Sequence, residues 1–176
     1  MDPTTLSGAE QAARLLIFPT ALMQLTLEEA RVVVNHMVPR FIEADTTFIR
    51  ESDAGDGGFM YLILKGEVVV ESITVSRTEP LTIKVVGPGS LIGEVGLLDQ
   101  EPRSASCTAS TPLYCAVLSR PALEALLDKD PKVGTKLLLA ISVLLAQRLR
   151  DNARKLRLYA KLAMTMHEEI DSFTRP

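Results

Sequence analysis

Residues 91–110, LIGEVGLLDQEPRSASCTAS, place a glutamate and an arginine nine positions apart in a run of apolar and small residues. A turn of helix beginning near Gly93 would present free backbone amides, and such amides suit phosphate when joined by the guanidinium of Arg103. The carboxylate of Glu94 would instead accept hydrogen bonds from hydroxyl groups. The stretch therefore suits a phosphorylated sugar. The residues alone leave a second interpretation open, in which Glu94 and Arg103 form a salt bridge across a loop.

Strand-like runs extend on both sides of this stretch. From Arg40 to Leu118, short apolar or alternating segments such as FMYLILKGEVVVES and LYCAVLS are separated by turn residues in KGE, GPGS and STP. Short strands at this regular spacing predict a sandwich or a barrel. Within this region a turn of helix is expected only at GEVGLL, residues 93–98.

The segment before the strands, from Ser7 to about Val38, has its apolar residues at helical spacing. Thr26 stands before LEEA and predicts a helix N-cap, because its hydroxyl can accept a hydrogen bond from a free amide of the first turn. Pro39 is expected to end this helix.

Helical patterns return after the strands. Ser119 followed by Pro121 predicts one helix start, and Asp130 followed by Pro131 predicts the start of a longer helix. A heptad seam in that longer helix is formed by Leu145, Leu149, Asn152, Leu156, Tyr159, Ala163, Met166 and Ile170. Because little chain is left to cover the seam, we expect it to form a homodimer. In the alternative interpretation, the seam packs back on the strands of its own chain.

Composition limits the classes of partner. The 176 residues carry a formal net charge of −3, which argues against a general nucleic-acid binder, and 47% of them are hydrophobic, enough for a sizeable core. Six basic residues lie within residues 148–161 against one acidic residue. We interpret them as a solvated helix face rather than a DNA contact.

Neither catalysis nor metal binding is predicted. Cys107 and Cys115 lie in strand-like runs without C-x-x-C spacing or nearby histidines, and are expected to be buried thiols rather than a disulfide or a metal site. His36 and His167 stand alone in helical segments, so no metal, no cofactor and no enzyme activity is expected. No signal peptide and no membrane span is expected either, which predicts a cytoplasmic address.

The stretch GPGSLIGEVGLLDQEPRSAS, residues 87–106, resembles the phosphate-binding cassette of the cyclic nucleotide-binding domain family. The family pattern is roughly G-x-x-[FI]-G-E-x-[AG]-L-L, a short spacer, then P-R-[ST]-A. A second stretch, ESDAGDGGFMYLILKGEVVV, residues 51–70, is similar to the family's strand–turn–strand motif, with Gly66 at the turn. The chain looks like a stand-alone bacterial-type relative of catabolite-activator-like and kinase-regulatory-subunit-like members.

The resemblance implies a mainly β fold with flanking α-helices. Its centre would be an eight-stranded jelly-roll barrel, with N-terminal helices before it and a long C-terminal helix after it. The expected parts are an N-terminal helical segment at 1–40, the barrel at 41–118 with its cassette at 89–106, and C-terminal helices at 119–171 that act as a lid and dimer seam.

The resemblance also implies roles in ligand binding. The cassette residues that would form the site are Ile92, Gly93, Glu94, Val95, Arg103, Ser104 and Ala105. Arg103 would bind an oxygen of the cyclic phosphate, and Glu94 would bind the ribose 2′-hydroxyl. The serine and the amides near Gly93, Val95 and Ala105 would complete the phosphate cradle, and the isoleucine and valine would wall the pocket.

The base would be covered by the long C-terminal helix, where Arg148 and Asn152 are the candidates. cAMP is the favoured ligand, and cGMP is the alternative because Ser104 could contact the guanine amino group. We expect a non-catalytic receptor that signals to a separate protein partner by ligand-dependent movement of the helix. The alternatives are a regulatory subunit or fragment of a larger assembly and, less favoured, a cAMP-responsive DNA-binding regulator.

Overall fold

The computed structural model describes residues 8–19, 21–22, 24–53, 58–72 and 81–174. The chain divides into two compact units, Met1–Ala140 and Ile141–Pro176. The helices are α1 (Gly8–Leu16), α2 (Leu27–Val34), α3 (Glu94–Asp99), α4 (Arg120–Lys129) and α5 (Pro131–Thr174). The strands are β1 (Val38–Ile42), β2 (Thr47–Ile49), β3 (Phe59–Lys65), β4 (Val68–Ser72), β5 (Leu81–Val86), β6 (Leu91–Ile92), β7 (Ser106–Ala109) and β8 (Leu113–Ser119).

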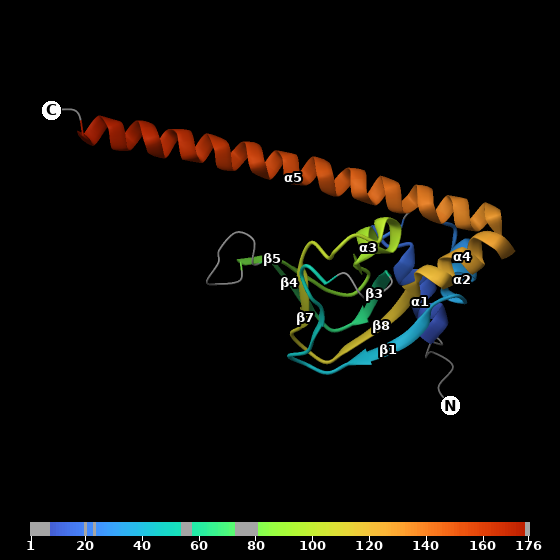
Figure 1. Cartoon of the computed structure of the whole chain (residues 1–176). Coiled ribbons are helices and arrows are strands. Elements are labelled where there is room, and N and C mark those ends of the chain that lie inside the picture. The colour runs from blue at the N-terminus through green and yellow to red at the C-terminus, as the bar shows by residue number, and fades with distance from the viewer. Residues whose placement is uncertain (1–7, 20, 23, 54–57, 73–80, 175–176) are drawn as a thin grey trace. The chain divides into compact units, whose positions relative to one another are not determined.

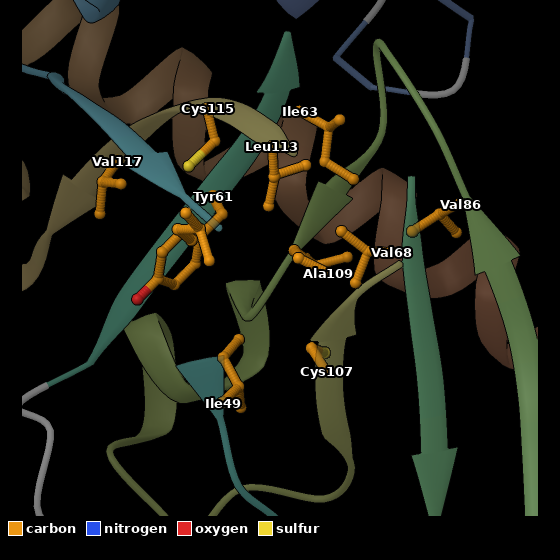
Figure 2. Close-up of a cluster of buried hydrophobic side chains, with 12 residues drawn as sticks. Ile49, Tyr61, Ile63, Val68, Val86, Cys107, Ala109, Leu113, Cys115 and Val117 are labelled. Carbon is orange, nitrogen blue, oxygen red and sulfur yellow. The ribbon is translucent and has the colours of Figure 1, made fainter. Parts of the chain in front are cut away.

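The strands of the first unit form two antiparallel four-stranded sheets, in the orders β1-β8-β3-β6 and β2-β7-β4-β5 (Figure 1). Both sheets supply side chains to one hydrophobic cluster (Figure 2). Tyr61 and Ile63 of β3 alternate into this cluster, as Cys107 and Ala109 of β7 do from the other sheet. Alternate residues of these two strands therefore point to the inner faces of the two sheets.

Strand β3 is buried on both faces. Its intervening residues Met60 and Leu62 are fully buried as well, and α1 contacts β3. The sequence of a strand that is covered on both faces is a continuous apolar run and not an alternation of apolar and polar residues. This burial explains the segment FMYLILK, and it makes β3 a rigid base for the loops at its ends.

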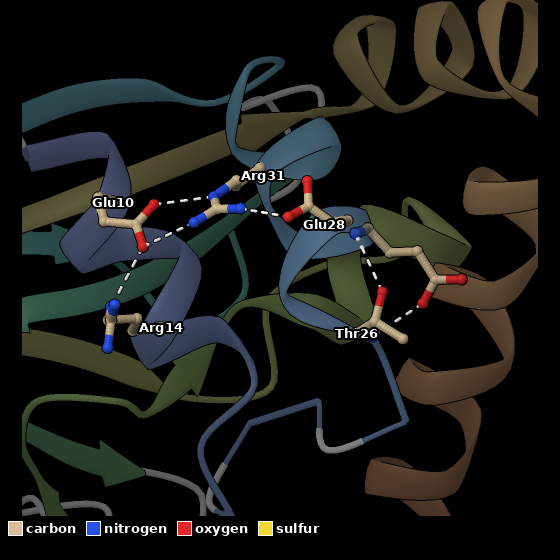
Figure 3. Close-up of polar contacts among 6 residues, drawn as sticks. Glu10, Arg14, Thr26, Glu28 and Arg31 are labelled. Carbon is tan, nitrogen blue, oxygen red and sulfur yellow. Dashed lines mark hydrogen bonds and ion pairs between the residues drawn. The ribbon is translucent and has the colours of Figure 1, made fainter.

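The two N-terminal helices are joined by ion pairs (Figure 3). Arg31 of α2 donates hydrogen bonds to both carboxylate oxygens of Glu10 on α1, at 2.9 and 3.0 Å, and also pairs with Glu28. The hydrogen bonds from Arg31 lower the pKa of Glu10. On α2, Glu29 binds the Lys136 ammonium at 2.6 Å, and this contact lowers the pKa of Glu29.

The three predicted helix caps are confirmed. Thr26 accepts a hydrogen bond from the Glu29 amide at 3.3 Å while the Glu29 carboxylate accepts one from the Thr26 amide at 2.8 Å, which is a capping box. Ser119 accepts from the Ala122 amide at 3.3 Å. Asp130 accepts from the Val133 amide at 3.1 Å. Local side-chain chemistry therefore fixes where α2, α4 and α5 begin.

The expectation that Pro39 ends the first helical region is wrong. Helix α2 ends at Val34, and Pro39 lies inside β1 opposite Ala116. β1 is the edge strand of its sheet, where a residue without an amide hydrogen removes no hydrogen bond to a second neighbour. Ser7, the expected start of this region, lies outside the described residues.

The two antiparallel sheets, the flanking helices and the long C-terminal helix agree with the predicted fold, but the closed barrel does not. Among the described strands, the sheets pack through side chains and no ladder of hydrogen bonds joins one sheet to the other. The edge strands β6 and β2 contain two and three residues, which leaves little backbone for closure. The jelly-roll connection and the boundaries 1–40, 41–118 and 119–171 stay predictions.

The second unit contains the continuation of α5. Leu149 is 71% exposed and Leu156 is 69% exposed, and Tyr159 and Met166 of the predicted seam are exposed as well. None of the described helices has an apolar stretch of the length needed to cross a membrane. The continuation of α5 therefore presents large apolar side chains to solvent.

We predict that Gly66→Ala destabilises the protein by about 1–3 kcal/mol. Gly66 turns β3 into β4 with φ +97°, and an added Cβ would stand 2.6 Å from the Pro112 carbonyl oxygen. Urea denaturation measures the change. Gly8→Ala is the matched control, because nothing lies within 4 Å of a Cβ at that position. Equal stability of the two variants would contradict this account of the turn.

We predict that both thiols are silent toward a thiol reagent at pH 8 until the protein unfolds. Burial raises the pKa of Cys107 to about 12 and that of Cys115 to about 11. The reactive thiolate is therefore scarce at pH 8, and the reagent also lacks access. Titration with a disulfide reagent in buffer and in denaturant checks this. Rapid labelling of the native protein would show that the core is not closed.

Candidate functional site

The predicted anion-binding stretch is built on a left-handed glycine. Gly93 follows β6 with φ +77° and is the N-cap of α3. A Cβ at this position would lie 2.6 Å from the Phe59 carbonyl oxygen of β3. Glycine is therefore required twice, for its backbone conformation and for the close approach of the two segments. The result is a six-residue helix that begins against Phe59, the first residue of β3.

Arg103 is buried beside this helix and fixed through its backbone and its side chain. Its amide donates to the Asp53 carbonyl at 3.1 Å, and its own carbonyl accepts from the Ser52 amide at 2.8 Å. Its Nη1 donates to the Gly93 carbonyl at 3.0 Å and to the Phe59 carbonyl at 3.3 Å. The guanidinium thus joins the start of α3 to β3.

The guanidinium of Arg103 also lies directly on Gly96. A Cβ at position 96 would stand 2.4 Å from Nη1 and 2.9 Å from Cζ of Arg103. This dependence on Gly96 was not predicted from the sequence, where the residue figured only as one glycine among several. The signal available was the small residue that the cassette pattern requires two positions after the glutamate.

Glu94 is the first residue of α3 and is 3% exposed. Its charge and that of Arg103 both act on the thiol of Cys107 in β7. Burial is the main cause of the raised pKa of Cys107, the Glu94 carboxylate raises it further, and the Arg103 guanidinium opposes the increase. The carboxylate and the guanidinium therefore lie within electrostatic reach of the same buried atom. Such a site can accept hydrogen bonds from hydroxyl groups and donate them to an anion.

The structure brings the two halves of the predicted cassette together. Ile92 is buried, Gly93 and Ala105 are half-buried, and Val95 and Ser104 are exposed. The bond from Arg103 to Gly93 connects the half at 92–95 with the half at 103–105. Arg148 and Asn152 belong to the second unit, where Arg148 is half-buried and Asn152 is exposed. Their predicted contact with the base stays a prediction.

A further arginine holds the opposite end of α3. Nη1 of Arg120 donates to the Leu97 carbonyl at 3.2 Å and to the Leu98 carbonyl at 3.0 Å. Sequence reasoning missed this residue and noted only the Ser119 cap beside it. One signal was present, because a cation in the first turn of a helix opposes the helix dipole and needs a partner elsewhere. Here Arg120 binds the carbonyl end of α3 and also pairs with Glu124 of its own helix.

Within the part of the chain that the structure describes, no group of three or more His, Cys, Asp or Glu residues is arranged to hold a metal ion.

The fold and this site have counterparts among known proteins. The family described as Cyclic nucleotide-binding domain matches residues 39–130, about half of the chain. The Cyclic AMP receptor protein of Thermus thermophilus is 31% identical over 127 residues, 72% of this chain and 56% of that protein. The cGMP-dependent protein kinase, isozyme 1, of Drosophila melanogaster is 29% identical over 126 residues, 70% of this chain and 16% of that protein.

This chain spans 10% to 56% of the length of the curated relatives it matches. Among solved structures, a cyclic nucleotide-binding domain from Methylobacillus flagellatus is 34% identical with a TM-score of 0.73, and the match covers 86% of this chain and 83% of that one. The two cassette halves, the sheets and these matches agree, and the chain belongs to the cyclic nucleotide-binding domain family.

Proposed function

We propose that this chain is a non-catalytic receptor for a cyclic nucleotide, with cAMP as its first ligand. The observation that carries the proposal is the burial of Glu94 and Arg103, the two charged side chains that are buried among the described residues. A carboxylate can accept a hydrogen bond from a ribose hydroxyl, and a guanidinium can donate hydrogen bonds to a cyclic phosphate. The two buried side chains therefore suit the two polar parts of a cyclic nucleotide.

In the proposed complex, each cassette residue has one task. Arg103 binds an oxygen of the cyclic phosphate, and Glu94 accepts a hydrogen bond from the ribose 2′-hydroxyl. The phosphate is surrounded by Ser104 and by the amides of Gly93, Val95 and Ala105. The apolar wall of the pocket is formed by Ile92 and Val95. No metal ion and no cofactor takes part.

The identity of the base is a finer part of the proposal. We place cAMP before cGMP, with Arg148 or Asn152 covering the base. The names of the relatives support both ligands, since one is a Cyclic AMP receptor protein and another is a cGMP-dependent protein kinase. Ser104 follows Arg103, and its hydroxyl oxygen can accept a hydrogen bond from the guanine amino group of cGMP.

The output would pass through the C-terminal helix to a separate protein. A ligand moves such a helix only if it binds the protein with different affinities when the helix is in one position and when it is in the other. The alternative is that the chain is a regulatory subunit or a fragment of a larger assembly. This alternative is supported by coverage, because the chain matches 56% of the length of one relative and 30% of another. A DNA-binding regulator is the third and least favoured candidate.

We predict that Arg103→Ala weakens cAMP binding by about 100-fold or more, because the phosphate charge then has no guanidinium partner. Arg103→Lys is expected to restore part of the affinity, since it keeps the charge but not the two-point geometry. Glu94→Gln removes the carboxylate without changing its size and is expected to weaken binding as well. Calorimetry on protein stripped of ligand by unfolding and refolding measures all three, with cAMP and cGMP compared.

Arg14→Ala is the matched control for these variants, because Arg14 is an exposed arginine of α1 that pairs with Glu10 one turn away on the same helix. Its affinity for cAMP is expected to equal that of the wild type. Circular dichroism confirms that each variant is folded before titration. Equal affinity of wild type and Arg103→Ala would refute the assignment of the site.

We predict a homodimer formed through the seam of α5, and that Leu156→Glu dissociates it. Leu156 is 69% exposed at the centre of the seam, and an ionised carboxylate in a helix pair is unfavourable. Sedimentation of the full chain gives the oligomeric state. Leu158→Glu is the control, because Leu158 is 57% exposed on the same helix but lies outside the seam. A monomeric wild type would exclude the dimer.

A further inference from the structure

The position of α3 depends on what holds its two ends. A helix of six residues is too short to be stable by itself, because few hydrogen bonds compensate for the entropy of forming it. Two of its backbone hydrogen bonds, from Leu97 to Gly93 and from Gln100 to Gly96, are both 3.3 Å long. Contacts from outside the helix must therefore fix it.

Arginine side chains supply such contacts at both ends. Arg103 donates to the Gly93 carbonyl at the start of α3. Arg120 donates to the Leu97 and Leu98 carbonyls at its finish. A guanidinium there complements the negative end of the helix dipole and satisfies carbonyls that have no partner within the helix. Only the first of these arginines belongs to the cassette.

Arg120 is itself held by α4. Its Nε donates to the Glu124 carboxylate one turn later at 2.9 Å, which leaves Nη1 directed toward α3. Its amide donates to the Gly58 carbonyl at 3.1 Å. A Cβ at Gly58 would stand 2.6 Å from the Gly96 carbonyl oxygen, so the backbone at Gly58 is in close contact with α3. The first residue of α4 thus reaches α3 through its side chain and through Gly58.

Helix α4 continues this contact to the first turns of α5. Asp130, which ends α4, accepts a hydrogen bond from the Val133 amide of α5. A Cβ at Gly134 of α5 would stand 3.1 Å from the Leu127 Cα of α4, which shows how closely the two helices pack. A displacement of α4 would therefore involve the start of the long helix.

We infer that Arg120 is a positioning residue that couples α4 to cyclic-nucleotide binding by holding the carbonyl end of α3. The inference rests on the proposed function of Glu94 and Arg103. A movement of α4 that takes Nη1 beyond hydrogen-bonding distance releases both carbonyls, and α3 then no longer holds Glu94 in place. Coupling is reciprocal, so ligand that fixes α3 also fixes the first turn of α4.

The test compares Arg120→Met, Arg120→Lys and the control Arg14→Met in the full chain, with cAMP as the probe. Arg14 also pairs with a glutamate four residues away, but on α1. Calorimetry is expected to show about ten-fold weaker cAMP binding in Arg120→Met, the size of a lost charged hydrogen bond, and partial recovery in Arg120→Lys. The control is expected to bind as the wild type does.

Hydrogen exchange supplies readouts that a merely structural role would not change. In ligand-free protein, the Leu97 and Gln100 amides of α3 should exchange faster in Arg120→Met than in the wild type. On addition of cAMP, the amides at positions 120 and 122 should become protected in the wild type and much less so in Arg120→Met. If Arg120→Met does not fold, Glu124→Gln replaces it, and the same changes are expected to be smaller because Arg120 loses only its orienting carboxylate.

Unchanged affinity or unchanged ligand-induced protection in a folded Arg120→Met would overturn the inference while leaving the receptor assignment intact. Failure of the wild type to bind cAMP and cGMP would instead overturn the proposed function. In that case, exchange at Leu97 and Gln100 without ligand still decides whether Arg120 positions α3, because that measurement needs no nucleotide.

Discussion

Two guanidinium groups keep the six-residue helix α3 in place by binding its backbone carbonyls, Arg103 at Gly93 and Arg120 at Leu97 and Leu98. The candidate site depends on this arrangement, because Glu94 is the first residue of α3. A longer helix could hold its shape through its own hydrogen bonds, whereas a short one takes its stability from tertiary contacts. The site is therefore as rigid as the segments that carry the two arginines.

Those segments are supported by the most deeply buried part of the molecule. Strand β3 is covered on both faces, and its first residue Phe59 supplies a carbonyl to Arg103. Gly58, just before it, receives the amide of Arg120 and packs against α3. Because a close-packed interior resists displacement, this end of β3 is a fixed reference for both ends of α3.

Family membership and specific function rest on different features. The cassette and the sheets are shared with cyclic nucleotide-binding domains, whose named relatives include regulators and protein kinases. What one member does with a bound nucleotide depends on how its cassette is connected to the rest of the chain. In this protein the described connection runs from α3 through Arg120 to α4, and from Asp130 to the first turn of α5. The exposed apolar residues of the second unit are the surface through which we propose that the chain forms a dimer.

The sequence by itself determined the features that depend on neighbouring residues or on a motif. The caps at Thr26, Ser119 and Asp130 were predicted because a side chain there binds an amide three residues away. The family was recognised because two stretches, residues 87–106 and residues 51–70, match its motifs. Pro39 misled the prediction, since the same residue that ends a helix is also tolerated in an edge strand, and only sheet order distinguishes the two.

The tertiary structure decided the contacts between segments distant in the sequence. That Arg103 lies on Gly96, and that Arg120 reaches the carbonyls of α3 more than twenty residues earlier, has no local signature. Whether the sheets close into a barrel was likewise settled by the pairing of strand edges and not by the alternation within each strand. The physical reason is the same in each case: sequence periodicity specifies which face of an element is buried, but the partner of a hydrogen-bonding group is fixed only when the elements pack.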